Sequence, residues 1–244
     1  MMERKADLKT VKAFWDLMSQ HFPELYVDLS LFNTLFNSAG DSQPFKEAVR
    51  EKVPITQAYE KTLELMDEYY KGMDILWRPS LAYFEENPEA LVSMLWVDDF
   101  NLENSLGLTP LFYVRAGSCP CKFQAYLKLQ EPVPLKKADS FQRVLVEFAG
   151  GGGNGFYFEH KRIAGLANGR YGDDPLVVFF GPFEKGVVDP KWLEELTLVF
   201  WDSAFRRNKE GDMKKKLERF LPLLEELESL LPFLKRLKRD SEDY

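Results

Sequence analysis

The sequence predicts an α+β protein with a mainly antiparallel sheet, flanked by helices at both ends. Short stretches rich in Val, Ile, Phe, Trp and Tyr lie in the middle of the chain, bounded by Gly, Pro and Asn, and indicate strands. Stretches with apolar residues three or four positions apart lie before and after them and indicate amphipathic helices. A single helix interrupts the strands, which favours α+β over a regular α/β alternation.

Residues 1–70 are expected to form an N-terminal helical layer that packs on the core. Val11, Phe14 and Met18 are spaced as on one face of a helix, and a second amphipathic stretch surrounds Leu63. Both stretches indicate helices that precede the strands.

Residues 71–190 are expected to form the core. A turn-forming segment separates two of its strands and predicts a hairpin, and a loop is expected at 131–134. A helix is expected at 138–148, followed by a glycine-rich connection. The expected strands are 74–79, 91–97, 111–114, 123–129 and 176–180.

Residues 191–244 are expected to form a C-terminal helical region. Pro222 and Pro232 interrupt its apolar pattern, which favours short helices that each begin near a proline over one long rod.

The composition is that of a globular protein, since 45% of the 244 residues are hydrophobic. No apolar run approaches the length that crosses a bilayer, so we expect a cytoplasmic protein without membrane contact. The net charge of −7 argues against a surface that attracts nucleic acid everywhere, although basic side chains gather locally. Cys119 and Cys121 flank Pro120 and are expected to be reduced packing residues.

Two adjacent acids, Asp98 and Asp99, close the apolar run 91–97. Carboxylates at the end of a buried strand need a cation, hydrogen bonds or charged partners to offset their desolvation, which points to a divalent metal. An aspartate that simply ends a strand in a turn is the alternative. Because successive strand residues point to opposite faces, the two can share a metal only if the strand ends, bulges or twists between them. We favour a strand end.

Four segments in order resemble the RepB-type replication primases of plasmids and phages, a branch of the archaeo-eukaryotic primase superfamily. Residues 72–79 resemble the strand ahead of that family's catalytic acids, and 96–100, Trp-Val-Asp-Asp-Phe, are similar to its valine-aspartate-aspartate-leucine. Residues 119–128 and 162–168 are similar to two later motifs, the second with Arg-Ile-Ala-Gly-Leu-Ala-Asn.

The resemblance implies a primase-type catalytic core that makes short primers on single-stranded DNA from nucleoside triphosphates. Asp98 and Asp99 would hold Mg²⁺ or Mn²⁺, and the metal would neutralise the triphosphate and activate the primer hydroxyl. A replicative helicase or an initiator protein is a candidate further partner. The expected nucleotide-binding residues are Lys122, Gln124, His160, Arg162, Asn168 and Arg170, and the expected template-binding residues are Arg78, Arg206, Arg207 and Lys209.

The sequence also departs from the family pattern. The family carries a third acid about eleven residues before the arginine of its last motif, where this chain has Gly151. Glu147, our candidate for the third catalytic acid, and Glu159 are the nearest carboxylates that could replace it. Cys119 stands where the family has serine.

Two other functions stay open at this point. The first is a degenerate primase-fold protein that binds single-stranded DNA or an origin hairpin without synthesis, which the missing acid and the acidic composition favour. The second is a metal-dependent nuclease in which Asp98 or Asp99 acts with Glu147, and Lys128 activates water.

Overall fold

The computed structural model describes residues 5–32, 44–69, 73–100, 109–115, 123–148, 157–168, 176–183 and 186–197. The chain divides into two compact units, residues 1–190 and 191–244. Of the second unit the structure describes residues 191–197, which are helical.

The first sheet has the strand order β2-β1-β3-β7 and is antiparallel throughout. In it β1 (Tyr26–Phe32) lies between β2 (Pro44–Pro54) and β3 (Asp74–Pro79), and β7 (Lys161–Arg162) pairs with the free side of β3. The short strand β7, late in the sequence, therefore completes a sheet whose other strands come from the first 79 residues.

The second sheet has the order β4-β6-β5-β8, again antiparallel. Its strands are β4 (Leu91–Phe100), β6 (Phe123–Pro134), β5 (Phe112–Arg115) and β8 (Val178–Phe180). A short strand, β9 (Val187–Val188), pairs in parallel with β6.

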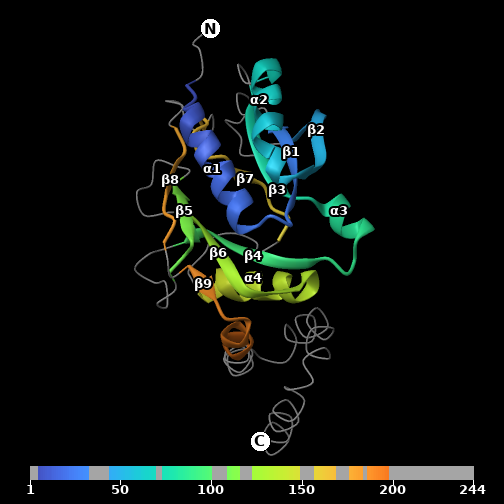
Figure 1. Ribbon diagram of the computed structural model, residues 1–244, viewed down its shortest axis with the longest axis vertical. Helices are drawn as coiled ribbons and strands as arrows, with labels where there is room; N and C mark the ends of the chain where they lie inside the picture. The colour runs from blue at the N-terminus through green and yellow to red at the C-terminus, as the bar shows by residue number, and fades with distance from the viewer. Residues whose placement is uncertain are drawn as a thin grey trace, which may run out of the picture. The chain divides into compact units, whose positions relative to one another are not determined.

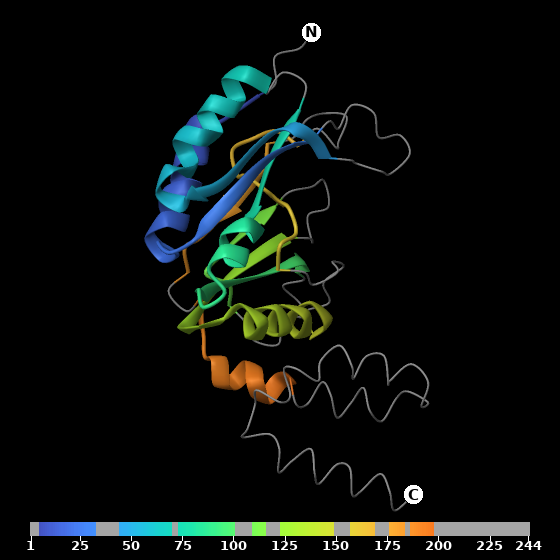
Figure 2. The same cartoon turned by 90° about the vertical axis from the view of Figure 1, so that its right-hand side faces the viewer.

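Helices cover both sheets (Figures 1 and 2). Figure 2 shows α1 (Leu8–His21) and α2 (Ala58–Tyr69) on the same face of the first sheet, and the short helix η1 (Ile55–Gln57) leads into α2. Figure 1 shows α4 (Leu135–Phe148) beneath β4 and β6 of the second sheet. The remaining helix, α3 (Leu81–Glu86), follows β3.

Local sequence explains where the helices begin. The carboxylate of Asp7 accepts hydrogen bonds from the backbone N–H groups of Lys9 and Thr10, which caps α1. The Ser80 hydroxyl accepts a hydrogen bond from the Tyr83 N–H and caps α3 in the same way.

A buried group of aromatic rings joins the two sheets. The Tyr126 ring of β6 stacks on Trp77 of the first sheet at 6.1 Å and on Phe112 of β5 at 4.5 Å. Phe14 of α1 meets these three rings edge-on at 6.0–6.5 Å. Because each such pair adds about 0.5–1.5 kcal/mol beyond area burial, this cluster fixes how the sheets meet.

The outer edge of β4 is held by α4 rather than by another strand. The Gln142 side chain of α4 accepts a hydrogen bond from the Trp96 N–H at 2.9 Å and donates one to the Trp96 carbonyl. Gln142 is completely buried. One side chain therefore satisfies both backbone groups that an edge strand would otherwise leave unpaired two residues before Asp98.

Most expected elements of the core are confirmed. β3, β4, β5, β6 and β8 lie at the expected strands, α4 covers the expected helix, and β5 and β6 pair as the predicted hairpin. The loop expected at 131–134 is wrong, because β6 continues to Pro134 along β4.

The helical interpretation of residues 8–70 is also wrong in part. Helices α1 and α2 are present, but β1 and β2 lie between them and belong to the first sheet. The glycine-rich connection and both prolines of the C-terminal region lie outside the described residues.

Replacing Gln142 by leucine should lower the free energy of unfolding by about 2–6 kcal/mol, because two buried backbone groups lose their partner at about 1–3 kcal/mol each. Urea denaturation followed by circular dichroism measures the change. The control is Gln130→Leu, an exposed position in β6, which should change stability by less than about 0.5 kcal/mol. Equal stability of the two variants would contradict the role given to Gln142.

Candidate functional site

Polar side chains line the face of the first sheet that points away from α1 and α2. In β1, Leu29 and Leu31 belong to the hydrophobic core, so the alternating residues Asp28 and Ser30 lie on the opposite face. The strict alternation of apolar and polar residues in β1 produces this arrangement.

The neighbouring strands extend the same face. In β3, Trp77 belongs to the core and Asp74 and Arg78 lie opposite, and the register places Arg78 beside Asp28. In β7, Arg162 pairs with Leu76 and therefore shares this face. We call the resulting set the polar row: Asp28, Ser30, Asp74, Arg78, His160 and Arg162.

Two carboxylates of the polar row each hold an arginine. Asp28 accepts a hydrogen bond from Arg78 Nε at 3.2 Å, and Asp74 pairs with Arg162 Nη1. Both aspartates are 1% exposed, whereas the Arg78 and Arg162 side chains are 28% and 15% exposed. Each guanidinium has five N–H donors, so these pairs fix its position and leave donors for a ligand.

His160 lies at the end of the polar row beside β1. Its Nε2 is 3.2 Å from the Ser30 hydroxyl, and its ring meets the edge of Phe32 at 4.8 Å. Burial lowers the pKa of His160 to about 4, and the positive charges of Arg78 and Lys161 act in the same direction. His160 is therefore neutral at pH 7 and can exchange a hydrogen bond with a ligand without carrying charge.

β7 connects the polar row to the second sheet. The Arg162 backbone N–H donates a hydrogen bond to Gln124 Oε1 of β6 at 3.4 Å. Gln124 is buried and pairs with Val114, which faces the core. The sequence motif containing Gln124 and the motif that begins at Arg162 thus meet directly.

Lys161 marks the junction on the core side of β7. It is completely buried, its Nζ lies 3.7 Å from the centre of the Trp96 ring, and it donates to the Glu159 carbonyl at 2.7 Å. Burial lowers the pKa of Lys161 well below its usual value, and the charges of Glu159 and Asp98 oppose that shift. The side chain therefore links β7 to β4 close to the acid pair.

The acid pair occupies a bulge. Val97 pairs with Ala125 and Phe100 with Phe123, so β4 has one residue more than β6 between these pairs, at Asp98 and Asp99. The strand end that we favoured is therefore wrong, because β4 continues to Phe100.

The charge of the half-buried Asp98 carboxylate affects the pKa values of Tyr126 and Lys161 at the junction. Burial raises the pKa of Tyr126 well above its usual value, and the Asp98 charge adds to that shift. Together with its effect on Lys161, this places Asp98 at the point where β4, β6 and β7 meet.

The other expected site residues divide into two groups. Asn168 is buried in the segment after β7, and Glu147 lies in the last turn of α4. The side chains of Glu147 and Asp99 are not among those that the structure describes. Lys122, Arg170, Arg206, Arg207 and Lys209 lie outside the described residues.

Sequence reasoning did not select four residues that the structure brings to this site: Asp28, Ser30, Asp74 and Lys161. The alternation Val-Asp-Leu-Ser-Leu at 27–31 is the period-two signal of a half-buried strand and could have identified the first two.

Oxygen donors in the bulge fit a hard divalent cation. Asp98 and Asp99 are adjacent carboxylates, the ligand type that Mg²⁺ and Mn²⁺ prefer. Asp28 and Asp74 pair with arginines instead. Among the side chains that the structure describes, no three His, Cys, Asp or Glu are grouped as metal ligands.

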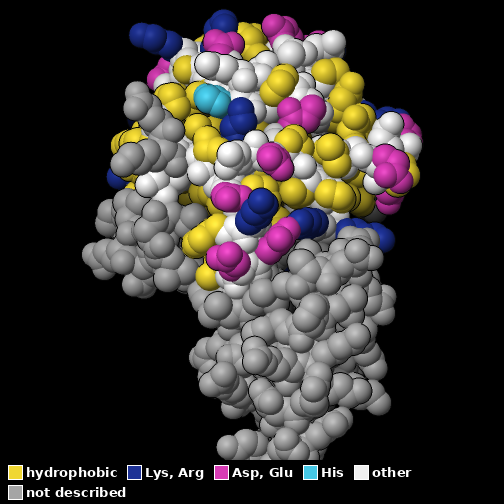
Figure 3. Space-filling model, turned by 60° about the horizontal axis from the view of Figure 1, so that its bottom comes forward, with side chains coloured by type: hydrophobic (Ala, Val, Ile, Leu, Met, Phe, Trp, Pro, Cys, Tyr) yellow, Lys and Arg dark blue, Asp and Glu magenta, His cyan; other side chains and the backbone are white. Residues whose placement is uncertain are grey.

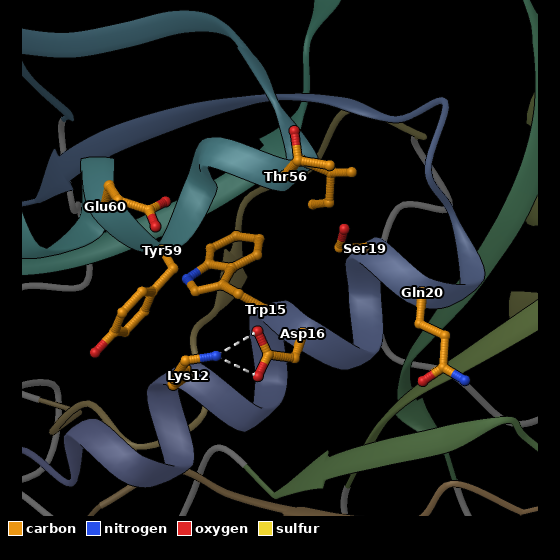
Figure 4. Close-up of a pocket in the computed structure, with 9 residues that line it drawn as sticks. Lys12, Trp15, Asp16, Ser19, Gln20, Thr56, Tyr59 and Glu60 are labelled. Atoms are coloured by element: carbon orange, nitrogen blue, oxygen red, sulfur yellow. Dashed lines mark hydrogen bonds and ion pairs between the residues drawn. The ribbon is translucent and has the colours of Figure 1, made fainter.

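A hollow of about 330 Å³ lies elsewhere, between α1, η1 and α2 (Figure 4). Its floor includes Trp15, and Lys12 and Asp16 form an ion pair at 2.7 Å on its rim. No expected site residue lines it.

Charge on the molecule is mixed in the view of Figure 3. In the described part of this face, acidic and basic side chains are interspersed among hydrophobic ones. In the described part of the chain, no helix is long and apolar enough to cross a membrane.

Solved structures with a similar fold include three of replication enzymes. The catalytic domain of primase RepB′ in complex with initiator DNA has a TM-score of 0.56 at 16% identity, covering 83% of this chain and 98% of that chain. A second structure of primase RepB′ has a TM-score of 0.58 at 16% identity, covering 91% and 77%.

The third structure is the archaeo-eukaryotic primase domain of the cyanophage S-2L primase-polymerase. Its TM-score is 0.54 at 15% identity, covering 79% of this chain and 99% of that chain. The sequence itself matches no protein-family model and no curated protein. The expected primase-type α+β core is confirmed, and the chain has a divergent form of the archaeo-eukaryotic primase fold.

Proposed function

We propose that this chain is a DNA primase that makes short primers on single-stranded DNA from nucleoside triphosphates, for a plasmid, phage or other mobile element. The observation that carries the proposal is the junction at β7: the Arg162 N–H donates to Gln124, and the neighbouring Lys161 lies against Trp96, two residues before the acid pair in its bulge. Primer synthesis needs carboxylates for metal and cationic donors for phosphates within one site.

Arg162 and Gln124 are the residues proposed to bind the nucleotide. Asp74 holds the Arg162 guanidinium in place, which reduces the entropy lost when the guanidinium binds a phosphate. His160, neutral at pH 7, contributes a hydrogen bond to the ribose or a phosphate. Lys122, Asn168 and Arg170 remain candidates from the sequence for the same ligand.

Asp98 and Asp99 are proposed to hold Mg²⁺ or Mn²⁺. The bound metal would neutralise the triphosphate and activate the primer hydroxyl. A bulge, unlike a regular strand, can bring two successive side chains to one ligand, and β4 has one at these two residues. Glu147, in the last turn of α4, is the proposed third carboxylate.

Arg78 is the described residue proposed to contact the template. One of the similar structures was solved with initiator DNA bound, which supports a nucleic-acid partner for this fold. The side chain is held by Asp28 and still 28% exposed, so it can donate to a phosphate. Arg206, Arg207 and Lys209 are further candidates from the sequence, and a replicative helicase or initiator protein is the proposed companion.

The nuclease alternative finds little support in the geometry. Lys128 pairs with Met94, four residues before Asp98 on β4, which is about 13 Å along a strand. A lysine that activates water at the acid pair would have to lie within hydrogen-bond reach of that water. The alternative of a DNA-binding protein without synthesis is decided by the first experiment below.

The double change Asp98→Ala and Asp99→Ala should abolish primer synthesis and Mn²⁺ binding but leave single-stranded DNA binding unchanged, because only metal ligands are lost. Labelled nucleotides on a single-stranded template measure synthesis, and paramagnetic relaxation measures Mn²⁺. The control Glu85→Ala with Glu89→Ala removes two exposed carboxylates elsewhere. If the unaltered protein binds single-stranded DNA but neither binds Mn²⁺ nor incorporates nucleotides into product, the primase proposal is contradicted.

The change Arg78→Gln should reduce the salt dependence of single-stranded DNA binding, lowering the slope of log K against log salt by about 0.7, because one phosphate contact is lost. Arg78→Lys should retain the slope. Arg50→Gln is the matched control, since Arg50 pairs with Glu68 of α2 instead. Equal slopes for all four proteins would contradict the template role of Arg78.

The His160 ring should titrate near pH 4 in the folded protein, against about 6.5 in the unfolded chain. Between these values only the unfolded chain takes up the proton, so stability falls as pH drops from 6.5 towards 4. NMR of the imidazole protons in His21→Asn, which leaves one histidine, measures the pKa. A value near 6.5 in the folded state would show that the ring is not held among Ser30, Arg78 and Lys161.

A further inference from the structure

We propose that single-stranded DNA also binds to an aromatic patch on the outer face of the second sheet, made of Tyr113, Arg115, Phe123, Phe180 and Phe183. The proposal rests on the primase function for its partner, but it concerns a surface that the catalytic site does not include. It adds a stacking platform for bases to the phosphate contacts of the polar row.

The patch lies outside the core. In β5, Phe112 and Val114 are buried in the core, and the alternating residues Tyr113 and Arg115 are half-buried on the other face. α4 packs on this face at β4 and β6, whereas the patch lies over β5, β8 and the start of β6. Phe180 of β8 is 37% exposed, which is unusual for a side chain of its size.

The rings contact one another as a continuous surface. Tyr113 lies 5.2 Å from Phe180, 5.5 Å from Phe183 and 4.8 Å from Phe123, measured between ring centres. Tyr113 and Phe183 are nearly parallel, with 19° between their planes. The neighbouring rings hold Tyr113 and Phe180 in place, so little side-chain entropy is lost when a flat ligand stacks on them.

A guanidinium gives the patch its charge. Arg115 lies 6.0 Å from the centre of the Phe180 ring, at the edge of the aromatic surface. Aromatic faces beside an arginine are the combination that binds single-stranded nucleic acid, because bases stack on the rings and the cation meets the phosphates. An apolar protein partner would leave the guanidinium without a counter-charge.

The position of the patch agrees with this partner. Phe123 pairs with Phe100, the residue that follows the acid pair, and Tyr113 is one step further across the sheet. The patch therefore begins at the same end of the second sheet as Asp98 and Asp99. The patch lies on the outer face there, so a template that leaves the acid pair would reach these rings around that end of the sheet.

The test measures binding of labelled oligo-dT in the Asp98→Ala, Asp99→Ala background without metal or nucleotide, so that the result does not depend on synthesis. Phe180→Ala should weaken binding about 5- to 150-fold, the loss expected for one stacked base, and leave the salt slope unchanged. Phe180→Trp should retain binding. Arg115→Gln should reduce the salt slope by about 0.7.

Leu91→Ala is the control, because Leu91 is a 49% exposed hydrophobic residue of β4 on the same sheet. Unchanged oligo-dT affinity in the double variant Phe180→Ala, Arg115→Gln would overturn the proposal. Equal weakening of duplex DNA binding would also overturn it, because a duplex offers no free base faces. The proposal would likewise be overturned if sedimentation showed that the substitutions reduce only self-association. If synthesis fails in the unchanged chain while Phe180→Ala still weakens oligo-dT binding, the patch stands and the primase proposal falls.

Discussion

The stacking of Tyr126 between Trp77 and Phe112 is the contact on which the rest of the structure depends. These rings come from different sheets, and Phe14 of α1 closes the group from the side. The cluster brings β7 of the first sheet against β4 and β6 of the second. Arg162 of the polar row and Gln124 of the second sheet meet at that junction, so an apolar contact decides where these polar groups come together.

Charged side chains at the same junction are unusually deeply buried. Lys161 is completely buried against Trp96, and Asp28 and Asp74 are almost as deeply buried beneath their arginines. Buried ion pairs are poor sources of net stability, because desolvation offsets most of the attraction. Their contribution is position: each carboxylate fixes one guanidinium on a rigid strand, as a site for an anionic ligand requires.

The sequence predicts those parts of the site that depend on local pattern. β3, β4 and β6 are visible as short runs rich in apolar and aromatic residues, and Asp98 stands out because an acid follows an apolar run. β1 was missed because its five-residue alternation lies between two strong helices. The bulge at Asp98 was not predictable in the same way, because it exists only relative to β6, whose register depends on the folded sheet.

The pairing of the arginines also bears on the missing third acid. Arg78 and Arg162 are each partly neutralised by a buried aspartate, so the polar row offers a triphosphate less positive charge than two free arginines would. A metal held by Asp98 and Asp99 would have to supply the difference. Where the primases that this sequence resembles carry a third acid, this chain has Gly151, so the proposed metal site depends more on the rigid setting of β4, with Gln142 on one edge and β6 on the other. The loss of a ligand is tolerable only where the remaining ligands are already held in position.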